Sequence, residues 1–225
     1  MANAQINGGF KVIKTSARKT YVGINNLFFI RGCRDMYGNE GGVGGAACKS
    51  KTPKAKTGII TAMSEHIKGC KYYEDGKYKE AIEAFNKALK VSSEYAEVFN
   101  GLGLAYIELG NFKRRPEAYK GEREKAKGDF DNAIEDFKEA IRLDQNYAEA
   151  FNNLGRAYLT RGEKGDVEQA IENYDIAIGI NPDYADAFNN RSIAYYIKGD
   201  LKQSREDHNK ALKLKQQTSK LARRG

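Results

Sequence analysis

Small and aromatic residues recur at positions i, i+4 and i+7 in four segments of the chain, which places each set on one face of an amphipathic helix. The four sets are Ala81, Phe85 and Ala88; Ala133, Phe137 and Ala140; Ala170, Tyr174 and Ala177; and Ser204, His208 and Ala211. A second helical pattern precedes three of them, at Phe99, Leu102, Gly103 and Tyr106; Phe151, Leu154, Gly155 and Tyr158; and Phe188, Arg191, Ser192 and Tyr195. Because one helical hairpin cannot bury its own apolar face, the pattern predicts hairpins stacked into an all-α solenoid.

These spaced positions resemble the tetratricopeptide repeat (TPR) family, whose helical hairpin has a 34-residue period. The resemblance covers about residues 62–214 and implies a right-handed superhelical solenoid of TPR hairpins. We expect four hairpins, at about 62–95, 96–147, 148–184 and 185–214. The family's closing proline is present at Pro182 but is replaced by Ser93 and Gln145 in the two preceding hairpins.

The second hairpin contains an insert, at residues 111–127. Phe99 and Phe151 are 52 residues apart, which is one 34-residue period plus 18. A helix that began at Phe112 would contain Pro116, whereas a turn at Gly128 followed by a helix from Phe130 restores the small and aromatic stripe. The insert is either a solvated helical extension or a basic contact element for an acidic partner. Its contact residues would be Lys113, Arg114, Arg115 and Lys120.

The net charge of +8 comes entirely from the N-terminal part of the chain. Residues 1–60 hold ten Lys or Arg and two acidic residues, while the remaining 28 basic and 28 acidic residues balance. We expect residues 1–60 to be a basic, Gly-rich arm or linker and residues 215–225 to be a basic tail that caps the last hairpin. The cytoplasm is the expected location. The alternative is lipid anchoring or organelle targeting through residues 1–33, where an apolar stretch precedes Gly32-Cys33.

The family resemblance implies that the first helix of each hairpin lines a concave groove that holds a peptide or a partner's helix. The groove positions would be Asn100, Leu104, Ile107, Asn152, Asn153, Arg156, Leu159, Asn189, Asn190, Ile193 and Tyr196. Asparagine recurs there at one register in three hairpins. Its amide can donate to and accept from one peptide unit, so this ladder predicts sequence-tolerant peptide binding, although asparagine also serves hairpin packing. Of the carboxylate clamp that the family's chaperone-tail binders use, the corresponding positions Asn100, Leu104, Asn153, Asp186 and Asn190 supply only the central Asn, so chaperone-tail binding is disfavoured.

Catalytic, metal and cofactor sites find little support in the sequence. His66 and Cys70 share a helical face but lack a third orienting group, and the three cysteines show no Cys-x-x-Cys spacing. The Gly-rich stretch before Lys49-Ser50 departs from a phosphate loop at Cys48. No apolar run reaches the roughly 18 residues of a membrane-spanning helix.

The sequence therefore predicts a non-catalytic interaction module or scaffold that binds a peptide or protein segment and needs no cofactor. One alternative is an RNA-binding helical-repeat protein that uses its basic arm and insert, although the neutral body disfavours nucleic acid. The other is a structural subunit of a larger assembly. The sequence leaves the oligomeric state open.

Overall fold

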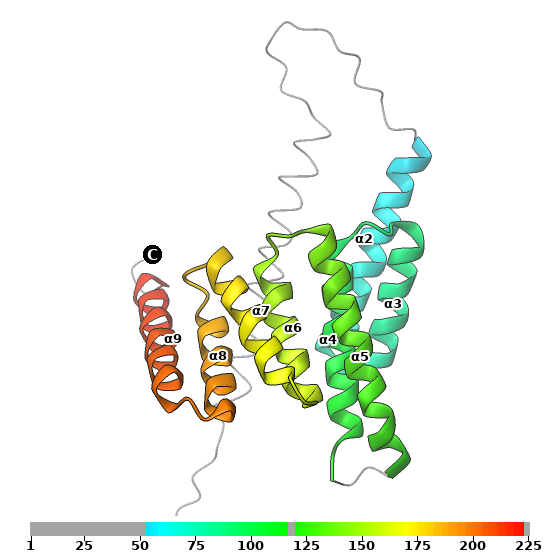
Figure 1. Cartoon of the computed structure of the whole chain (residues 1–225). Coiled ribbons are helices and arrows are strands. Elements are labelled where there is room, and N and C mark those ends of the chain that lie inside the picture. Colours follow the sequence, from blue (N-terminus) through cyan, green and yellow to red (C-terminus); the bar gives the residue numbers. More distant parts are fainter. Residues whose placement is uncertain (1–52, 117–119, 223–225) are drawn as a thin grey trace, which may run out of the picture. The chain divides into compact units, whose positions relative to one another are not determined.

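The computed structural model describes residues 53–116 and 120–222, and within them the chain forms eight α-helices and no strand (Figure 1). The helices are α2 (Pro53–Glu74), α3 (Tyr78–Val91), α4 (Ala96–Lys113), α5 (Lys120–Leu143), α6 (Ala148–Arg161), α7 (Asp166–Ile180), α8 (Ala185–Lys198) and α9 (Leu201–Ala222). Successive helices pair as hairpins, α2 with α3, α4 with α5, α6 with α7 and α8 with α9. The all-α solenoid of hairpins predicted from the sequence is confirmed.

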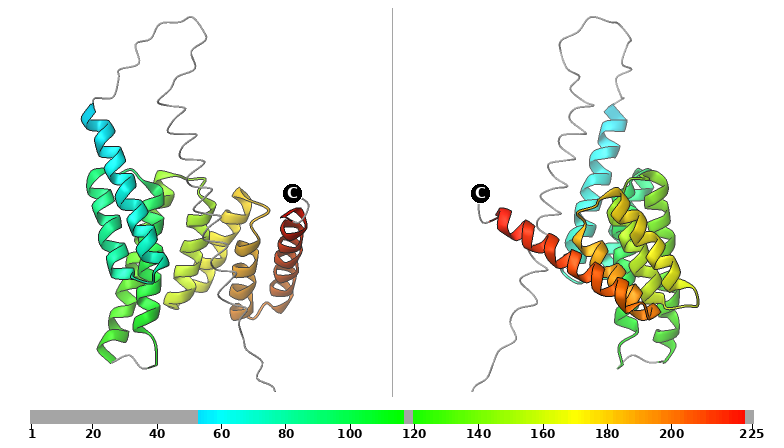
Figure 2. Two further views of the ribbon diagram at one scale, coloured as in Figure 1. Left: turned by 180° about the vertical axis from the view of Figure 1, so that it is seen from behind. Right: turned by 60° about the vertical axis from the view of Figure 1, so that its left-hand side comes forward.

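The helices form two layers (Figures 1 and 2). The first helices of neighbouring hairpins contact one another, α2 with α4, α4 with α6 and α6 with α8. Each second helix contacts its own partner, and α3, α5 and α7 also contact the first helix of the next hairpin, but no contact joins one second helix to another in the described part of the chain. The first helices are thus the more closely spaced layer, and they present one common surface, which we call the first-helix face.

Each of the two central hairpins is locked by an aromatic ring that packs against a glycine. The ring of Phe137 lies against Gly103, and that of Tyr174 lies against Gly155. A Cβ atom on either glycine would lie 2.7 Å from the ring, closer than carbon atoms approach without displacement. The stripe of the second helix therefore packs only because the first helix offers a glycine, which is the close crossing expected from the sequence.

The insert lengthens both helices of the second hairpin instead of forming a separate element. Phe130 is 1% exposed and Phe112 is 52% exposed, so Phe130 packs in the core as predicted. The predicted turn at Gly128 is wrong, because α5 already begins at Lys120 and passes through Gly128 as a helix. The residues that precede Gly128 are mostly Lys, Glu, Arg and Ala, which favour helix and place the start of α5 eight residues before Gly128.

The structure also shifts both ends of the predicted solenoid. Helix α2 begins at Pro53, inside the stretch assigned to the N-terminal arm, and proline is a favoured residue in the first turn of a helix. Helix α9 continues to Ala222, through most of the predicted tail. Residues 1–52, which contain the rest of the predicted arm and targeting segment, lie outside the described residues.

Candidate functional site

The asparagines of the first-helix face form a hydrogen-bonded chain across three helices. Asn153 Nδ2 donates to Asn100 Oδ1 at 3.0 Å, which joins α6 to α4. Asn190 Nδ2 donates to Asn152 Oδ1 at 2.9 Å, which joins α8 to α6. Asn152 Nδ2 completes the chain with a longer bond of 3.4 Å to Asn153 Oδ1. We call this arrangement the asparagine ladder.

The ladder uses much of its hydrogen-bonding capacity between the hairpins. Asn152 is buried, and its side chain also bonds Tyr184. In this geometry the amides hold neighbouring hairpins in register, which is the packing role that the sequence left open beside peptide binding. Asn189 has the register of Asn100 and Asn152, but no following hairpin supplies an asparagine to it.

The remaining predicted groove residues differ in their exposure. Leu104 and Leu159 are partly buried against the central core. Ile107 is 1% exposed, because it packs in the central core with residues such as Phe137 and Leu154, so its assignment to the groove is wrong. Tyr196 has the same register on α8 and is 67% exposed. Ile193 is also exposed, so α8 carries the most accessible apolar residues of the predicted set.

Arg156 is the basic residue at the centre of this face. Its Nη2 lies 4.0 Å from Glu108 Oε1, and both side chains are about one-third exposed. Tyr73, at the end of α2, lies close to the same pair. Burial, followed by the charge of Glu108, raises the pKa of Tyr73 to about 12, while Arg156 acts in the opposite direction. The pair joins three first helices electrostatically, and the Nε and Nη2 atoms of Arg156 are buried.

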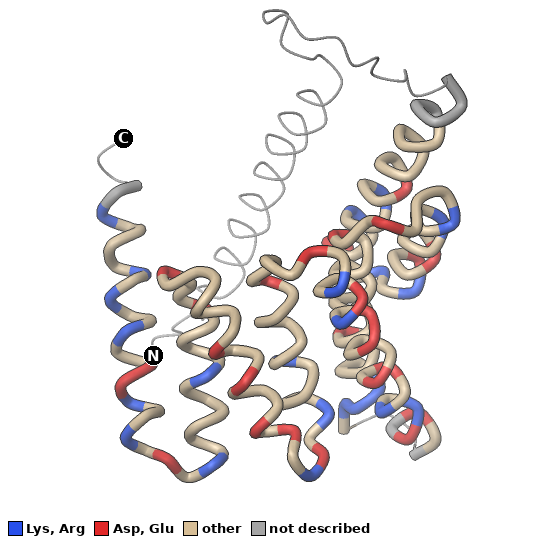
Figure 3. The backbone as a smooth tube through the Cα atoms, turned by 45° about the horizontal axis from the view of Figure 1, so that its top comes forward, with Lys and Arg blue, Asp and Glu red and all other residues tan. Residues whose placement is uncertain are grey.

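One edge of the face is acidic (Figure 3). Glu97, Glu149 and Asp186 occupy the second position of α4, α6 and α8. Burial, followed by the charges of Glu97 and Glu149, raises the pKa of Tyr147. Asp186 is paired with Lys215 of α9, with Nζ and Oδ1 3.0 Å apart. A peptide that lies along this edge would contact carboxylates. The chaperone-tail binders of the family instead present lysine and arginine to a peptide's carboxylates.

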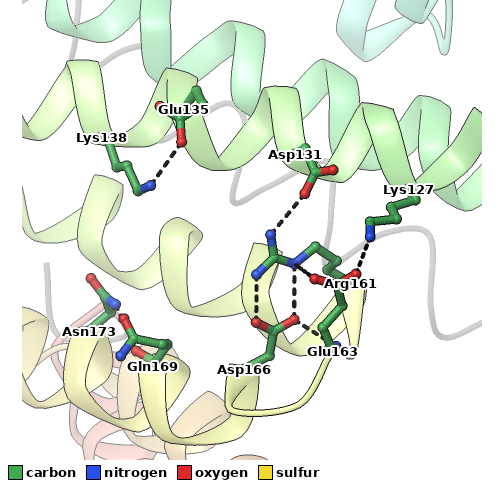
Figure 4. Close-up of polar contacts among 9 residues, drawn as sticks. All are labelled: Lys127, Asp131, Glu135, Lys138, Arg161, Glu163, Asp166, Gln169 and Asn173. Atoms are coloured by element: carbon green, nitrogen blue, oxygen red, sulfur yellow. Dashed lines mark hydrogen bonds and ion pairs between the residues drawn. The ribbon is translucent and has the colours of Figure 1, made fainter.

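Two arginine clusters hold the hairpins together, and the sequence pattern did not reveal them. Arg161 donates from Nη2 and Nε to Asp166 at 2.7 and 3.1 Å, and from Nη1 to Asp131 at 2.8 Å (Figure 4). Burial alone would raise the pKa of Asp166, but the bonds from Arg161 and from the Glu163 backbone N–H outweigh it, and the pKa is lowered. The cluster therefore ties the turn between α6 and α7 to α5.

Arg191 forms the second cluster, in the last hairpin. It occupies the register of Leu154, and it donates from Nε and Nη2 to Asp207 at 2.7 and 2.8 Å. Its Nη1 donates to Asp175 of α7. The sequence does contain a signal for this cluster, because an arginine at a position occupied by leucine in the preceding hairpin needs an acidic partner. The sequence alone does not identify Asp207 as that partner, because the pairing depends on how α8 packs against α9.

The basic residues of the insert contact the protein itself. Lys113 Nζ lies 2.7 Å from Asp129 Oδ2, and this pair is mostly buried. Arg114 donates to the backbone oxygen of Thr160 and lies over the ring of Phe130. Arg115 is exposed and lies over Phe112. Lys120 is the first residue of α5, and its side chain is not among those that the structure describes. Two of the four predicted contact residues thus stabilise the hairpin.

The His66 and Cys70 pair lacks the properties of a nucleophile and base. The Sγ and Nε2 atoms are 3.4 Å apart. Burial lowers the pKa of His66 to about 4 and raises the pKa of Cys70 to about 11, so the thiol stays protonated and the imidazole stays neutral. Among the described residues, no cluster of His, Cys, Asp and Glu could hold a metal ion. No helix among them is long and apolar enough to cross a membrane.

Comparison with known proteins identifies the class. A family model described as TPR repeat matches residues 69–110, 121–162 and 163–199, and one described as Tetratricopeptide repeat matches residues 185–218. The chain therefore belongs to the tetratricopeptide repeat family.

Two curated proteins are similar over part of the chain. The small glutamine-rich tetratricopeptide repeat-containing protein of Dictyostelium discoideum is 30% identical over 111 residues, which cover 48% of this chain and 28% of that protein. The BBSome complex member BBS4 of Bos taurus is 31% identical over 102 residues, which cover 39% of this chain and 20% of that protein. The chain thus spans less than one-third of the length of either relative.

Solved structures share the fold. The crystal structure of MamA superposes with a TM-score of 0.56 and 25% identity, covering 74% of this chain and 87% of MamA. A thermophilic TPR protein of Thermus thermophilus gives a TM-score of 0.56 at 23% identity and covers 68% of this chain and 74% of its own. The first TPR of Spaghetti (RPAP3), bound to an HSP90 peptide, gives 0.52 at 21% identity and covers 63% of this chain and 95% of its own.

Proposed function

We propose that the first-helix face of α4, α6 and α8 binds a peptide or an extended segment of a partner protein. The observation that carries this proposal is the exposure of Ile193 and Tyr196 on α8, next to the partly buried Asn189. Exposed apolar side chains beside amide groups suit a backbone held by hydrogen bonds with one or two apolar anchors. The peptide-bound neighbour of the same fold offers a precedent for this kind of module.

The asparagine ladder sets what this face can recognise. Because Asn100, Asn152 and Asn153 bond to one another, only their remaining lone pairs and N–H groups are available to a ligand. The segment would then gain most of its affinity from contact with α8 and much less from the ladder. RNA binding and a structural role in an assembly remain alternatives that no specific contact among the described residues favours.

A peptide library tests the proposal. Unstructured peptides displayed on phage are selected against the intact chain, and the affinities of those selected are measured by calorimetry. We expect Ile193→Ser with Tyr196→Ala to weaken binding at least about tenfold, which is the loss of one or two anchor residues. Ile176→Ser, an exposed isoleucine of α7, is the matched control and should bind as the wild type does.

Two outcomes contradict the proposal. One is the recovery of no peptide that binds the intact chain. The other is equal binding by the α8 variant and the wild type, with circular dichroism showing that both are folded. Asn153→Ala is less informative as a test, because it also removes the hydrogen bond that joins α6 to α4.

A further inference from the structure

Helix α9 exposes a face that is covered in the two second helices before it. On α5 the face consists of Phe130, Ile134, Phe137 and Ile141. The rings of Phe130 and Phe137 lie against Gly110 and Gly103 of α4, and Ile134 and Ile141 pack in the core that also holds Leu154 of α6. On α7 it consists of Val167, Ile171, Tyr174 and Ile178. The Tyr174 ring lies against Gly155 of α6, and Ile178 packs against the cluster that contains Phe188 of α8. The same register on α9 gives Leu201, Arg205, His208 and Leu212, which we call the end face. All four of its residues are exposed.

The end face keeps two apolar residues at a defined separation. Leu201 is 58% exposed and Leu212 is 45% exposed. They are eleven residues apart, which is three helical turns and about 16 Å along the axis. Each leucine lies in a shallow hollow with charged residues at its rim, the first lined by Lys202, Arg205 and Glu206 and the second by Lys215 and Lys220.

The charge around these hollows is mainly positive. Lysine and arginine follow one another along the exposed part of α9, visible as blue segments in Figure 3. Four basic residues line the hollows, Lys202, Arg205, Lys215 and Lys220, and Lys215 is also paired with Asp186 of α8. Of the two acids on α9, Asp207 is buried and bonded to Arg191, which leaves Glu206 beside Leu201 and Arg205. A complementary surface would therefore be acidic.

From these observations we infer that the end face of α9 is a docking site for an acidic amphipathic helix of a partner protein. The shape follows from the repeat, since α6 and α8 show that a helix fits against this face of a second helix. The partner places two apolar side chains about three turns apart over Leu201 and Leu212, and carboxylates beside Arg205 and the neighbouring lysines. This surface is separate from the first-helix face, so it does not depend on the function proposed there.

Electrostatics favours a different protein over a second copy of this chain. A symmetric dimer through α9 would bring two basic surfaces together, because a two-fold axis pairs each patch with itself. Like charges across such an interface oppose association. Two isolated leucines are also less apolar surface than an interfacial helix needs to lie in a membrane.

A synthetic peptide measures the proposed interaction directly. The probe is a fluorescent, alanine-rich helical peptide with two leucines eleven residues apart and glutamates beside them. One control peptide has lysine in place of each glutamate, and a second has serine in place of each leucine. Fluorescence anisotropy with the full chain gives each affinity, and salt titration reports the contribution of charge.

Variants of the chain locate the binding site. We expect Leu201→Glu with Leu212→Glu to weaken binding of the acidic peptide at least about tenfold. Lys202→Glu with Arg205→Glu should weaken it several-fold and reduce its salt dependence. Lys87→Glu with Lys90→Glu, at exposed lysines of α3, is the matched control and should leave binding unchanged.

Four results would overturn the inference. They are the absence of binding by the acidic peptide, equal binding of the lysine peptide, self-association of the full chain that Leu201→Glu with Leu212→Glu abolishes, and binding to anionic vesicles lost in the same variant. Loss of binding in the leucine variant, with the helical circular dichroism of the wild type retained, supports it. Sedimentation of the free chain distinguishes self-association from partner binding.

Discussion

Asp136 is a partly buried carboxyl group without the arginine partner that Asp207 has at the same register, and we expect Asp136→Asn to stabilise the protein. It lies on α5 directly before Phe137, and its Oδ2 atom is buried without a hydrogen-bond partner among the described residues. Burial, followed by the charges of Glu135 and Glu139, raises the pKa of Asp136 from 3.8 to about 7. The folded state therefore disfavours ionised Asp136.

The size and pH dependence of the effect follow from this pKa. Below about pH 4 the carboxyl is protonated in both the folded and the unfolded chain. Between about pH 4 and pH 7 the unfolded chain releases a proton that the folded chain keeps, so the free energy of unfolding falls as the pH rises. At about 1.4 kcal/mol per pKa unit, ionisation costs on the order of 2 kcal/mol near pH 5 and about 4 kcal/mol near pH 8.

The fold contains two natural comparisons at the same register. Asn173 precedes Tyr174, and its Nδ2 donates to the backbone oxygen of Gln169 at 2.7 Å, so an amide is accommodated at this position of a hairpin. Asp207 precedes His208 and accepts two hydrogen bonds from Arg191. The same substitution should therefore have opposite effects, with Asp136→Asn stabilising and Asp207→Asn destabilising the protein.

Urea unfolding followed by circular dichroism at about pH 5 and about pH 8 measures the effect. The gain in free energy of unfolding from Asp136→Asn should be about 2.5 kcal/mol larger at the higher pH. Asp207→Asn serves as the control of opposite sign. If the difference between Asp136→Asn and the wild type is the same at both pH values, Asp136 titrates normally and the reasoning is refuted.

Three further predictions concern glycines, an ion cluster and a thiol. Gly155→Ala should lower the urea midpoint, because its Cβ would lie 2.7 Å from the Tyr174 ring. Gly179→Ala is the control, because its Cβ meets open space, and it should raise the free energy of unfolding by about 0.5–1 kcal/mol. Equal urea midpoints of the two variants would contradict this prediction. Arg161→Met should lower the free energy of unfolding by about 3 kcal/mol at neutral pH, because it leaves Asp166 buried without its charge partner. The loss should shrink as the pH falls and Asp166 is protonated, and urea unfolding at two pH values measures it. The thiol of Cys70, with its pKa raised to about 11, should react with iodoacetamide much more slowly in the folded than in the unfolded chain, as measured by peptide mass spectrometry.

The hairpin repeat could be predicted because its sequence signal is local and periodic. The spacing of Ala133, Phe137 and Ala140 fixes a helical face, and Gly103 marks where that face is received. The chain reversal of the insert could not be placed in the same way. Glycine at 128 indicates a turn, but helix-favouring residues on both sides and the Lys113–Asp129 ion pair allow the helix to pass through it.

The register of the candidate site could be predicted, but the use of its side chains could not. Asparagines at equal positions on successive helices could face a ligand or one another, since an amide is both donor and acceptor. The choice depends on the spacing between first helices, which brings Asn153 within 3.0 Å of Asn100. Ile107 shows the same limit, because only the placement of the next hairpin decides that it is buried while Tyr196 is not.

The hairpin of α8 and α9 differs from the hairpins before it at one register. An inner hairpin has neighbours on both sides, so apolar residues such as Ile134 and Phe137 are covered. At the same register of α9 the chain has Arg205 and His208, and the Arg191–Asp207 pair joins α8 to α9 from the buried side. A helix face that contacts only water is expected to carry polar residues at every position. Leu201 and Leu212 depart from this expectation, because both are apolar and exposed. Their retention among basic residues is the reason to expect a partner there, and the leucine variant of α9 is the direct test.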